Sequence, residues 1–381
     1  MKEFDLSTNV FFGENSLERL EWCENKSIII VTDGFMEKSG VVDKIKSHMD
    51  GRGNKIFVFS KTVPDPPIEV IAEGVKCLAE CQANVMVALG GGSAIDAAKA
   101  IRVMADRMGY AHIEECFAIP TTSGTGSEVT KFSVITDSAA GIKYPLVDSE
   151  LQPMVAILDP ELVSTVPPAI TADTGIDALV HALEAYVSTE ATDFTDALAE
   201  KATTLLMKFL PLAYKDGNDL LAREKVHNAA CLAGMAFNAA GLGICHSIAH
   251  QIGAKFHISH GRSNAMVLAE VIRYNADLEA IGKGNRSTCA RKYQRMAKLI
   301  GLPYVNNLVA VNSLARRVEE MKKLFGIPTT LQQLDVDPAK VRELKDEMIR
   351  NALKDTCTST NPRHVDEVAI GKIIDKITPI V

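Results

Sequence analysis

Short apolar runs alternate with amphipathic segments over residues 1–165 of the chain. Four of these runs are rich in branched or aromatic apolar residues and too short for helices, which predicts buried strands: SIIIVTDGF (27–35), NKIFVFS (54–60), NVMVAL (84–89) and AILDPEL (156–162). The first three are followed by segments with helical spacing of apolar positions. This alternation is typical of a parallel sheet covered by helices, so residues 1–165 are predicted to form an α/β domain.

The pattern changes after VPP (166–168), which we interpret as a hinge. Strand-like runs nearly vanish, and apolar positions recur every three to four residues, as on one face of a helix. The clearest helical segments are DFTDALAEKATTLLMKFLPLAY, EKVHNAACLAGMAFNAAG, SNAMVLAEVIRYNA, ARKYQRMAKLIG and SLARRVEEMKKLFG. Residues 166–381 are therefore predicted to form an all-helical domain, apart from an exposed basic loop at 282–289, and a functional site is expected in the cleft between the two domains.

Composition narrows the class of protein without naming it. The chain has 381 residues, 47% of them hydrophobic, and a net charge of −7 without any basic run, which argues against nucleic acid or an anionic membrane as partner. Its eight cysteines are scattered without a C-x-x-C pair, so reduced thiols are expected rather than disulfides or a zinc knuckle. Because neither a signal peptide nor an apolar stretch of membrane-spanning length is found, we expect an enzyme of the cytoplasm or of a compartment reached without a cleaved signal.

The stretch NVMVALGGGSAIDAAKA (84–100) carries a candidate phosphate site. Glycines that end a strand and open a helix let backbone N–H groups approach a phosphate, with the helix dipole assisting. Gly90–Ser93 has this arrangement, although it is not G-x-G-x-x-G, and glycine runs also make ordinary tight turns. Ser93 and Asp96 are spaced as a capping box, and Lys99 is interpreted as a solvated helix residue.

A second loop strengthens the prediction of a nucleotide site. FAIPTTSGTGSEVT (117–130) follows a predicted strand and offers many short hydroxyl and amide donors, and neither loop contains the G-x-S-x-G of serine hydrolases. Asp33, after the first strand, could accept hydrogen bonds from an adenosine ribose and would repel a 2′-phosphate, which favours NAD over NADP. The alternative for Asp33 is a turn residue before Gly34. Lys143, in a hairpin-like segment, could contact phosphate or ribose.

A carboxylate and an imidazole lie four residues apart in DTGIDALVHALEAYVS (173–188). This segment has helical spacing, no internal proline and a capping Thr171, so Asp177 and His181 are predicted to leave one face of one helix. Such a spacing suits chelation of a metal ion. A single pair of this kind is nevertheless more often a surface hydrogen bond than a metal site.

A cluster of histidines changes that balance. His246, His250, His257 and His260 fall within fifteen residues, the first two one helical turn apart and the last beside a Gly261 that we expect to break a helix. Their neighbours are apolar, and buried imidazoles without partners would carry a desolvation cost that coordination removes. A carboxylate with several imidazoles is a ligand set suited to Fe(II), Zn(II) or a similar divalent ion, so a metal site is the favoured interpretation.

Four motifs together resemble the iron-containing alcohol dehydrogenase family: GGGSAIDAAKA, PTTSGTGSEVT, GIDALVHALEAY and GLGICHSIAHQIGAKFHISHG. Their order and spacing match from about residue 5 to TNPR near the C-terminus. The resemblance implies a dehydroquinate-synthase-like fold and a hydride transfer between NAD(H) and an alcohol or aldehyde. Within the family, DFTDALAEKA, GIKYPL and the short length are similar to the propanol dehydrogenases of propanediol-degrading microcompartments, which implies a short-chain primary alcohol and a location inside such a compartment.

The resemblance also assigns roles to residues of this chain. The implied ligands of a metal ion, usually Fe(II) and with Zn(II) as the alternative, are Asp177, His181, His246 and His260. His250 is implied to stand near the nicotinamide as a proton relay, and His257 to line the pocket or support it. The implied contacts to NAD(H) are Asp33, Gly91, Gly92, Ser93, Thr121, Thr122, Thr125 and Lys143. Arg262 departs from the family, which usually carries a small or apolar residue there, and this puts the local pocket charge in question.

Other functions fit these residues less well. A dehydroquinate-synthase-like or glycerol-phosphate-dehydrogenase-like enzyme would need converging cations for an anionic substrate, and only Lys255 and Arg262 lie near the expected ligands in sequence. A metal-dependent hydrolase would leave the glycine loops purely structural, and a non-catalytic scaffold would leave the histidines unexplained. The expected partners are a small alcohol or aldehyde and further copies of the chain, as a dimer or higher oligomer, with microcompartment components as the remaining candidates.

Overall fold

The computed structural model describes residues 3–138, 142–278 and 287–378. They form two compact units: unit 1 comprises Met1–Val166 and Gly217–Asn238, and unit 2 comprises Pro167–Asp216 and Ala239–Val381. The first change of unit, between Val166 and Pro167, lies one residue after the expected boundary between residues 165 and 166. The segment 217–238 belongs to unit 1, whereas the sequence analysis placed it in the second domain. Most of the predicted basic loop at 282–289 lies outside the described residues.

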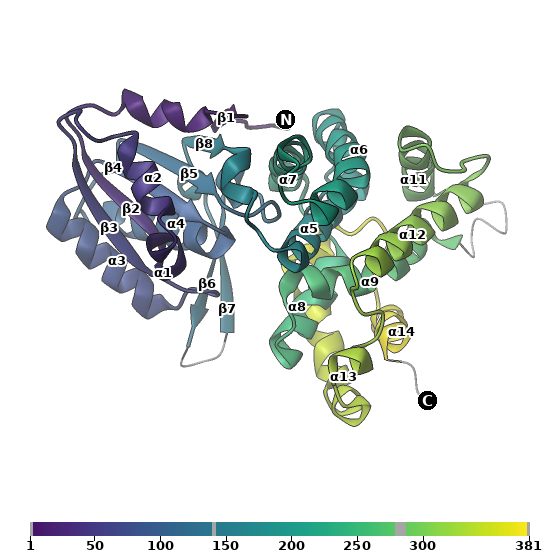
Figure 1. The fold of residues 1–381 in the computed structure, drawn as a ribbon. Helices are drawn as coiled ribbons and strands as arrows, with labels where there is room; N and C mark the ends of the chain where they lie inside the picture. The colour runs from purple at the N-terminus through teal and green to yellow at the C-terminus, as the bar shows by residue number, and fades with distance from the viewer. Residues whose placement is uncertain (1–2, 139–141, 279–286, 379–381) are drawn as a thin grey trace. The chain divides into compact units, whose positions relative to one another are not determined.

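Unit 1 is built on a six-stranded parallel sheet (Figure 1). Its strands, in spatial order, are β1 (Asn9–Phe12), β8 (Val155–Leu158), β5 (Glu115–Pro120), β4 (Val85–Gly90), β2 (Ser27–Asp33) and β3 (Lys55–Thr62). This confirms the predicted α/β architecture. The sequence pattern missed β1, because a four-residue edge strand carries too little alternation to be recognised.

Both faces of the sheet are covered, as its nearly continuous apolar strands require. Ile29 and Val31 of β2 face the cluster that packs under α3 (Ile68–Cys81) and α4 (Gly92–Arg107). Ile28 and Ile30 face the opposite cluster, which packs under η1 (Ser16–Trp22) and α2 (Val41–Ser47). A short helix, α1 (Gly34–Lys38), follows β2 directly.

Two further pieces complete unit 1. β6 (Phe132–Asp137) and β7 (Ile142–Val147) pair as an antiparallel hairpin, which confirms the hairpin predicted around Lys143. α7 (Leu220–Ala240) joins the unit through Cys231 and Met235, whose side chains belong to an apolar cluster with sheet residues of β8. Burial of this helix face explains why 217–238 groups with the sheet although it lies far away in sequence.

The described part of unit 2 contains helices and no strand, as predicted (Figure 1). Its α-helices are α5 (Pro168–Val187), α6 (Asp193–Lys215), α8 (Ile244–Phe256), α9 (His260–Ala276), α11 (Thr288–Leu299), α12 (Asn307–Leu324), α13 (Pro338–Lys354) and α14 (Glu367–Ile377). α9 packs against both α5 and α8, and α8 also packs against α13. Among the described helices, no single one is long and apolar enough to cross a membrane; only α7 and α8, taken together across a bend, meet the length and composition.

Candidate functional site

Three loops of unit 1 meet at one edge of the sheet. β5, β4 and β2 are neighbours and run in parallel, so their carboxyl ends lie side by side. Asp33 ends β2, Gly90 ends β4 and Pro120 ends β5. The structure therefore brings together the two predicted donor loops and the predicted ribose contact, at the edge where ligands of open α/β sheets bind.

The glycines of the first loop are required by close approaches within this edge. Gly90 has φ 142°, which other residues rarely adopt, and a Cβ there would lie 2.8 Å from the Cβ of Ala94. A Cβ on Gly92 would lie 2.7 Å from Cγ2 of Thr125, in the second loop. Gly91 is the N-cap of α4, and no side chain among the described residues caps that terminus, which leaves its amides available to an anion.

The remaining predicted cofactor residues lie at the same edge. Asp33 Oδ1 accepts hydrogen bonds from the N–H groups of the first turn of α1, so this residue does cap a turn, while its Oδ2 lies near Gly90. Lys143 forms an ion pair of 2.6 Å with Asp65, whose N–H donates to Ser93 Oγ at 3.4 Å. The two other predicted contacts in the second loop are Thr121, which is buried, and Thr122, whose Oγ1 lies 3.5 Å from the Cβ position of Gly91.

Two structural predictions in this region are wrong. Asp96 does not form a capping box with Ser93, because its carboxylate instead accepts hydrogen bonds from Ser127 Oγ (2.5 Å) and the Val134 N–H (2.9 Å). Lys99 is not solvated, since it is only 1% exposed and its ammonium donates to Ser127 Oγ and two backbone carbonyls. Burial lowers the pKa of Lys99 to about 8, against the opposing effect of the nearby carboxylates. Both side chains thus attach the end of the second loop to α4.

α7 supports the second loop from another side, which sequence reasoning missed. Nδ1 of the buried His227 lies 2.9 Å from Ser123 Oγ, and its Nε2 has no hydrogen-bond partner among the described residues. Burial lowers the pKa of His227 to about 4, so its ring is neutral near pH 7. Gly234 allows α7 to touch the loop, because a Cβ there would lie 2.8 Å from Gly126 Cα. No local sequence signal connects α7 to a loop a hundred residues earlier.

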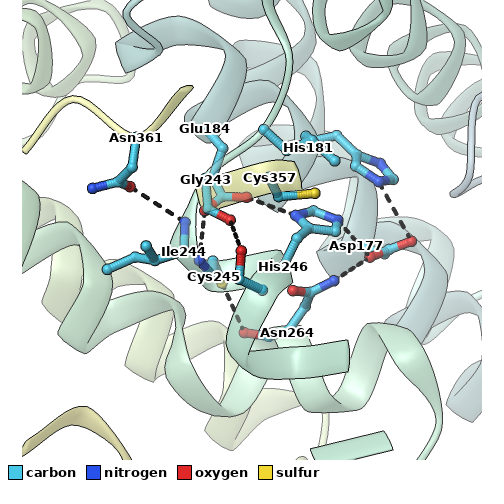
Figure 2. Close-up of polar contacts among 12 residues, drawn as sticks. Asp177, His181, Glu184, Gly243, Ile244, Cys245, His246, Asn264, Cys357 and Asn361 are labelled. Atoms are coloured by element: carbon cyan, nitrogen blue, oxygen red, sulfur yellow. Dashed lines mark hydrogen bonds and ion pairs between the residues drawn. The ribbon is translucent and has the colours of Figure 1, made fainter. Parts of the chain in front are cut away.

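Unit 2 gathers one carboxylate and three imidazoles around a single point. Asp177 and His181 come from α5, His246 from α8 and His260 from α9, and their candidate ligand atoms all lie within 4.8 Å of one another. The Asp177 carboxylate lies 3.9 Å from Nε2 of His181, 3.8 Å from Nε2 of His246 and 3.5 Å from Nε2 of His260. Figure 2 shows Asp177, His181 and His246 turned toward one another.

The local structure that brings these residues together differs in two details from the prediction. α5 begins at Pro168 with Pro167 as its N-cap, so Thr171 lies inside the helix and does not cap it. Gly261 does not break a helix, because it lies in the first turn of α9. A Cβ on Gly261 would lie 2.0 Å from the Asp173 carbonyl oxygen of α5, so the glycine allows the start of α9 to reach the helix that carries Asp177.

Two further side chains hold the cluster in place (Figure 2). The buried Glu184 lies 2.6 Å from Nδ1 of His246 through Oε2, and its Oε1 accepts the Cys245 N–H at 2.7 Å. Asn264 Nδ2 donates to Asp177 Oδ1 at 2.8 Å. Sequence reasoning missed both, although Glu184 lies on the same face of α5 as the predicted ligands and helical spacing could have identified it.

The protonation of the cluster suits a divalent cation. Burial, reinforced by repulsion from the neighbouring imidazoles, lowers the pKa of His246 well below its usual value, so the ring is neutral. Its buried Nε2 has no hydrogen-bond partner among the described residues and faces the Asp177 carboxylate. Burial raises the pKa of Glu184 to about 8, although hydrogen bonds from backbone N–H groups oppose this shift, and a cation bound among the four residues would favour the ionised carboxylate. Coordination at Nε2 requires the His246 proton at Nδ1, where Glu184 is placed to accept it. The donor set therefore fits a metal such as Fe(II) or Zn(II).

The other candidate residues lie around this cluster. His250, one turn after His246 on α8, stacks on His260 with ring centroids 5.4 Å apart, and its Nδ1 lies 2.7 Å from Asp355 Oδ2. His257 is exposed and forms the left-handed C-cap of α8 with φ 55°. Arg262 pairs with Asp173 at 3.2 Å. This ion pair offsets the positive charge of Arg262, whose effect on the pocket the sequence alone did not determine.

Exposure differs across the site. The side chains of Asp177, His181 and His246 are 6% exposed or less, whereas those of His260 and His250 are 43% and 40% exposed. A small molecule can therefore reach the cluster from the side of these two histidines. The arrangement can bind one cation, polarise a ligand oxygen beside it and accept a proton nearby.

Two family models match the chain. The family model described as "Iron-containing alcohol dehydrogenase" matches residues 7–160. The model described as "Fe-containing alcohol dehydrogenase family, C-terminal" matches residues 171–378. Together the two matches cover most of the chain.

Full-length relatives point the same way. The chain is 45% identical over 379 residues to 1-propanol dehydrogenase PduQ of Citrobacter freundii, covering 99% of this chain and 100% of that protein. It is 38% identical to an NADPH-dependent butanol dehydrogenase of Clostridium saccharobutylicum, covering 98% and 97%. Among solved structures, a 1,3-propanediol oxidoreductase is similar, with a TM-score of 0.89, 31% identity and coverage of 99% and 100%.

Proposed function

The chain belongs to the iron-containing alcohol dehydrogenase family, and from that premise we propose that it transfers a hydride between NAD(H) and a short-chain primary alcohol or its aldehyde. Propanol and propanal are the expected pair, in line with the similarity to a 1-propanol dehydrogenase. The observation that carries the proposal is the convergence of one carboxylate and three imidazoles within 4.8 Å in unit 2.

The proposed ligands of the ion are Asp177, His181, His246 and His260. Three neutral nitrogen donors and one carboxylate suit Fe(II), and Zn(II) is the alternative. A divalent ion held there supplies a Lewis acid that polarises the substrate oxygen. The protein contributes fixed donors, since Glu184 orients His246 and Asn264 holds Asp177.

The proposed contacts to NAD(H) lie at the sheet edge of unit 1. The uncapped N-terminus of α4 and the hydroxyl loop after β5 would hold the diphosphate, through Gly91, Gly92, Ser93, Thr121, Thr122 and Thr125. Lys143 would approach the same ligand if it left Asp65. Asp33 favours NAD(H), because a carboxylate beside the ribose repels a 2′-phosphate. Because the chain is also similar to an NADPH-dependent butanol dehydrogenase, the preference for NAD(H) over NADP(H) should be measured directly.

His250 is the proposed proton relay between substrate and solvent. Its ring stacks on the ring of His260, a proposed ligand, and its side chain is 40% exposed. An imidazole has an intrinsic pKa near neutrality and can pass a proton in either direction. This placement connects the reacting oxygen with bulk water.

The rival functions are less well supported. An anionic substrate would call for free cations near the cluster, but Lys255 pairs with Glu347 at 2.6 Å and Arg262 pairs with Asp173. A metal-dependent hydrolase would have no use for the glycines and the uncapped helix terminus that lie together at the sheet edge. The paired cations agree with an uncharged substrate, and the glycines and helix terminus at the sheet edge agree with a dinucleotide.

Four broader assignments belong to the same proposal. Unit 1 would bind the cofactor, and unit 2, which carries the four proposed ligands, would bind the metal. The protein would assemble as a homodimer or a higher homo-oligomer. It would act in the cytoplasm, and inside a bacterial microcompartment if it shares the setting of the propanol dehydrogenases that it resembles.

The direct test is consumption of NADH or NADPH with C2 to C4 aldehydes, using protein prepared without oxygen and loaded with Fe(II). We expect turnover with NADH, faster with propanal than with acetaldehyde or butanal, and weaker turnover with NADPH. Zn(II)-loaded protein serves as the metal comparison. Absence of turnover with every aldehyde and both cofactors would refute the proposed function.

A further inference from the structure

His250 is held by a carboxylate from a distant part of the chain. Its Nδ1 lies 2.7 Å from Oδ2 of Asp355, 105 residues later. Asp355 stands between α13 and the short helix η6 (Thr356–Thr360), which it caps by accepting the Cys357 N–H at Oδ1 (2.9 Å). The side chain of Asp355 is 15% exposed. Its position is therefore set by its own helix junction and does not depend on His250.

The charge of Asp355 agrees with its role as an acceptor. Burial acts to raise the pKa of this carboxyl, but the hydrogen bond from His250 and the Cys357 N–H hold it below its usual value. An ionised carboxylate can only accept a hydrogen bond, so Nδ1 of His250 must carry the proton. The other ring nitrogen, Nε2, is then a free acceptor in the neutral imidazole.

The same arrangement occurs one helical turn earlier on α8. Nδ1 of His246 lies 2.6 Å from Glu184 Oε2, so each of the two histidines is held at Nδ1 by a carboxylate from another element. The two rings are neighbours, with centroids 6.1 Å apart. Nε2 of His246 belongs to the four-residue cluster, whereas His250 lies outside it. Glu184 thus holds a proposed metal ligand, His246, and Asp355 holds an imidazole beside the proposed metal site, His250.

The segment around Asp355 is itself fastened to α8. Thr358 Oγ1, in η6, lies 2.8 Å from Ser247 Oγ, next to His246. Asn361 Oδ1 accepts the Ile244 N–H at the start of α8, at 3.3 Å. These contacts keep the Asp355 carboxylate in register with His250, which a single long-range hydrogen bond would not ensure.

We propose that Asp355 is a positioning residue that fixes the Nδ1–H tautomer of His250 and leaves Nε2 to exchange a proton with the substrate oxygen. The inference rests on the proposed function. In alcohol oxidation, Nε2 of His250 would take the hydroxyl proton as the O–H bond breaks, and a bound nicotinamide would accept the C–H electron pair as hydride while the C=O bond forms. Asp355 stabilises the resulting imidazolium, which returns the proton to solvent through its exposed edge.

The decisive variant is Asp355→Asn. The Asn side chain can still accept the Cys357 N–H through its oxygen, but its NH2 group then faces Nδ1, which favours the opposite tautomer of His250. We expect kcat to fall by about 10- to 100-fold, the range seen when a carboxylate that orients a histidine is removed, while metal content and the Kd of NADH stay unchanged. The exposed Asp346→Asn, on α13, is the matched control.

The tautomer itself provides a readout independent of turnover. In Zn(II)-loaded protein with 15N-labelled histidine, NMR should show His250 protonated at Nδ1 in the wild type and at Nε2 in Asp355→Asn. His250→Gln identifies the signal. If Asp355→Asn fails to fold, Asp355→Ser still offers a cap for η6, is too short to reach the imidazole and should lose the Nδ1–H preference.

Three outcomes would overturn the inference. The first is wild-type kcat in a folded Asp355→Asn variant. The second is a His250 tautomer that does not depend on residue 355. The third is a second bound ion that is lost with Asp355, because His250, Asp355 and Cys357 place ligand atoms within 4.8 Å of one another and could form a metal site instead. A wild type inactive with every alcohol would refute the proposed function, whereas the NMR measurement would still decide the role of Asp355.

Discussion

At the scale of single residues, the site depends on which nitrogen of each histidine carries the proton. His246 is buried between Glu184 at Nδ1 and Asp177 facing Nε2. Its lowered pKa keeps it neutral, which a metal ligand must be. His250 has a comparable carboxylate partner in Asp355 but lies outside the cluster. We therefore expect metal binding to depend on His246 and not on His250.

Asp177→Asn should lose both metal and activity, because it removes the only carboxylate among the proposed ligands. His250→Ala should retain a full complement of metal, while its kcat falls by about 100- to 10,000-fold, as expected for loss of a general acid or base. Elemental analysis of anaerobically purified protein, together with steady-state kinetics, measures both quantities. A metal-replete and active Asp177→Asn, or a metal-free His250→Ala, would contradict the assignment.

The buried His227 predicts a stability change with pH. Burial lowers its pKa to about 4, whereas in the unfolded chain the pKa is near 6.5. Between these values the unfolded state binds a proton that the folded state does not, so stability is lost as pH falls through this window. Once the pH is below 4, the loss from this residue amounts to about 3 kcal/mol.

His227→Gln should remove that part of the acid sensitivity. Denaturant titrations of the wild type and the variant at pH values from 7 to 4 measure it as the difference between their free energies of unfolding. His112→Gln, at a position whose side chain is 77% exposed, is the control. If the wild type and His227→Gln lose stability in parallel, His227 does not have the lowered pKa.

At the scale of elements, helical periodicity predicted α5 and α8 and placed Asp177 and His181 on one face. It did not predict where helices begin. The N-caps of α4 and α5 are Gly91 and Pro167 instead of the predicted Ser93 and Thr171, and α9 begins before the glycine that was expected to break a helix. The clearest case is Gly261, whose missing side chain leaves room for the Asp173 carbonyl.

Gly261→Ala should shift the start of α9 and carry His260 away from Asp177. The new methyl would lie 2.0 Å from a backbone oxygen, which cannot yield as a flexible side chain would. We expect a loss of about 1–3 kcal/mol in the free energy of unfolding and a metal affinity at least about 10-fold weaker. Gly371→Ala is the matched control within a helix, because its nearest contact would be 3.5 Å. Unchanged metal affinity in Gly261→Ala would show that this close approach is not needed.

At the scale of the whole molecule, the sequence predicted the order of sheet and helices and all four residues of the cluster. Local patterns placed the glycine loops after strands and Asp177 and His181 on one helix face, whereas the choice of His246 and His260 among the later histidines came from the family resemblance. The contacts that sequence reasoning missed join distant segments: Ser123 and His227 are 104 residues apart, and His250 and Asp355 are 105 apart. The place of α7 in unit 1 was missed for the same reason, because packing on the sheet leaves no mark in its own periodicity.

The central claim is that Asp177, His181, His246 and His260 bind one divalent ion. Anomalous diffraction at the iron edge, from crystals of protein loaded with Fe(II) under anaerobic conditions, tests it most directly. We predict a single peak per chain, about 2.0–2.2 Å from one carboxylate oxygen and three imidazole nitrogens of these residues. A peak at His250, Asp355 and Cys357 instead, or iron-replete protein without a peak among the four proposed ligands, would contradict the account.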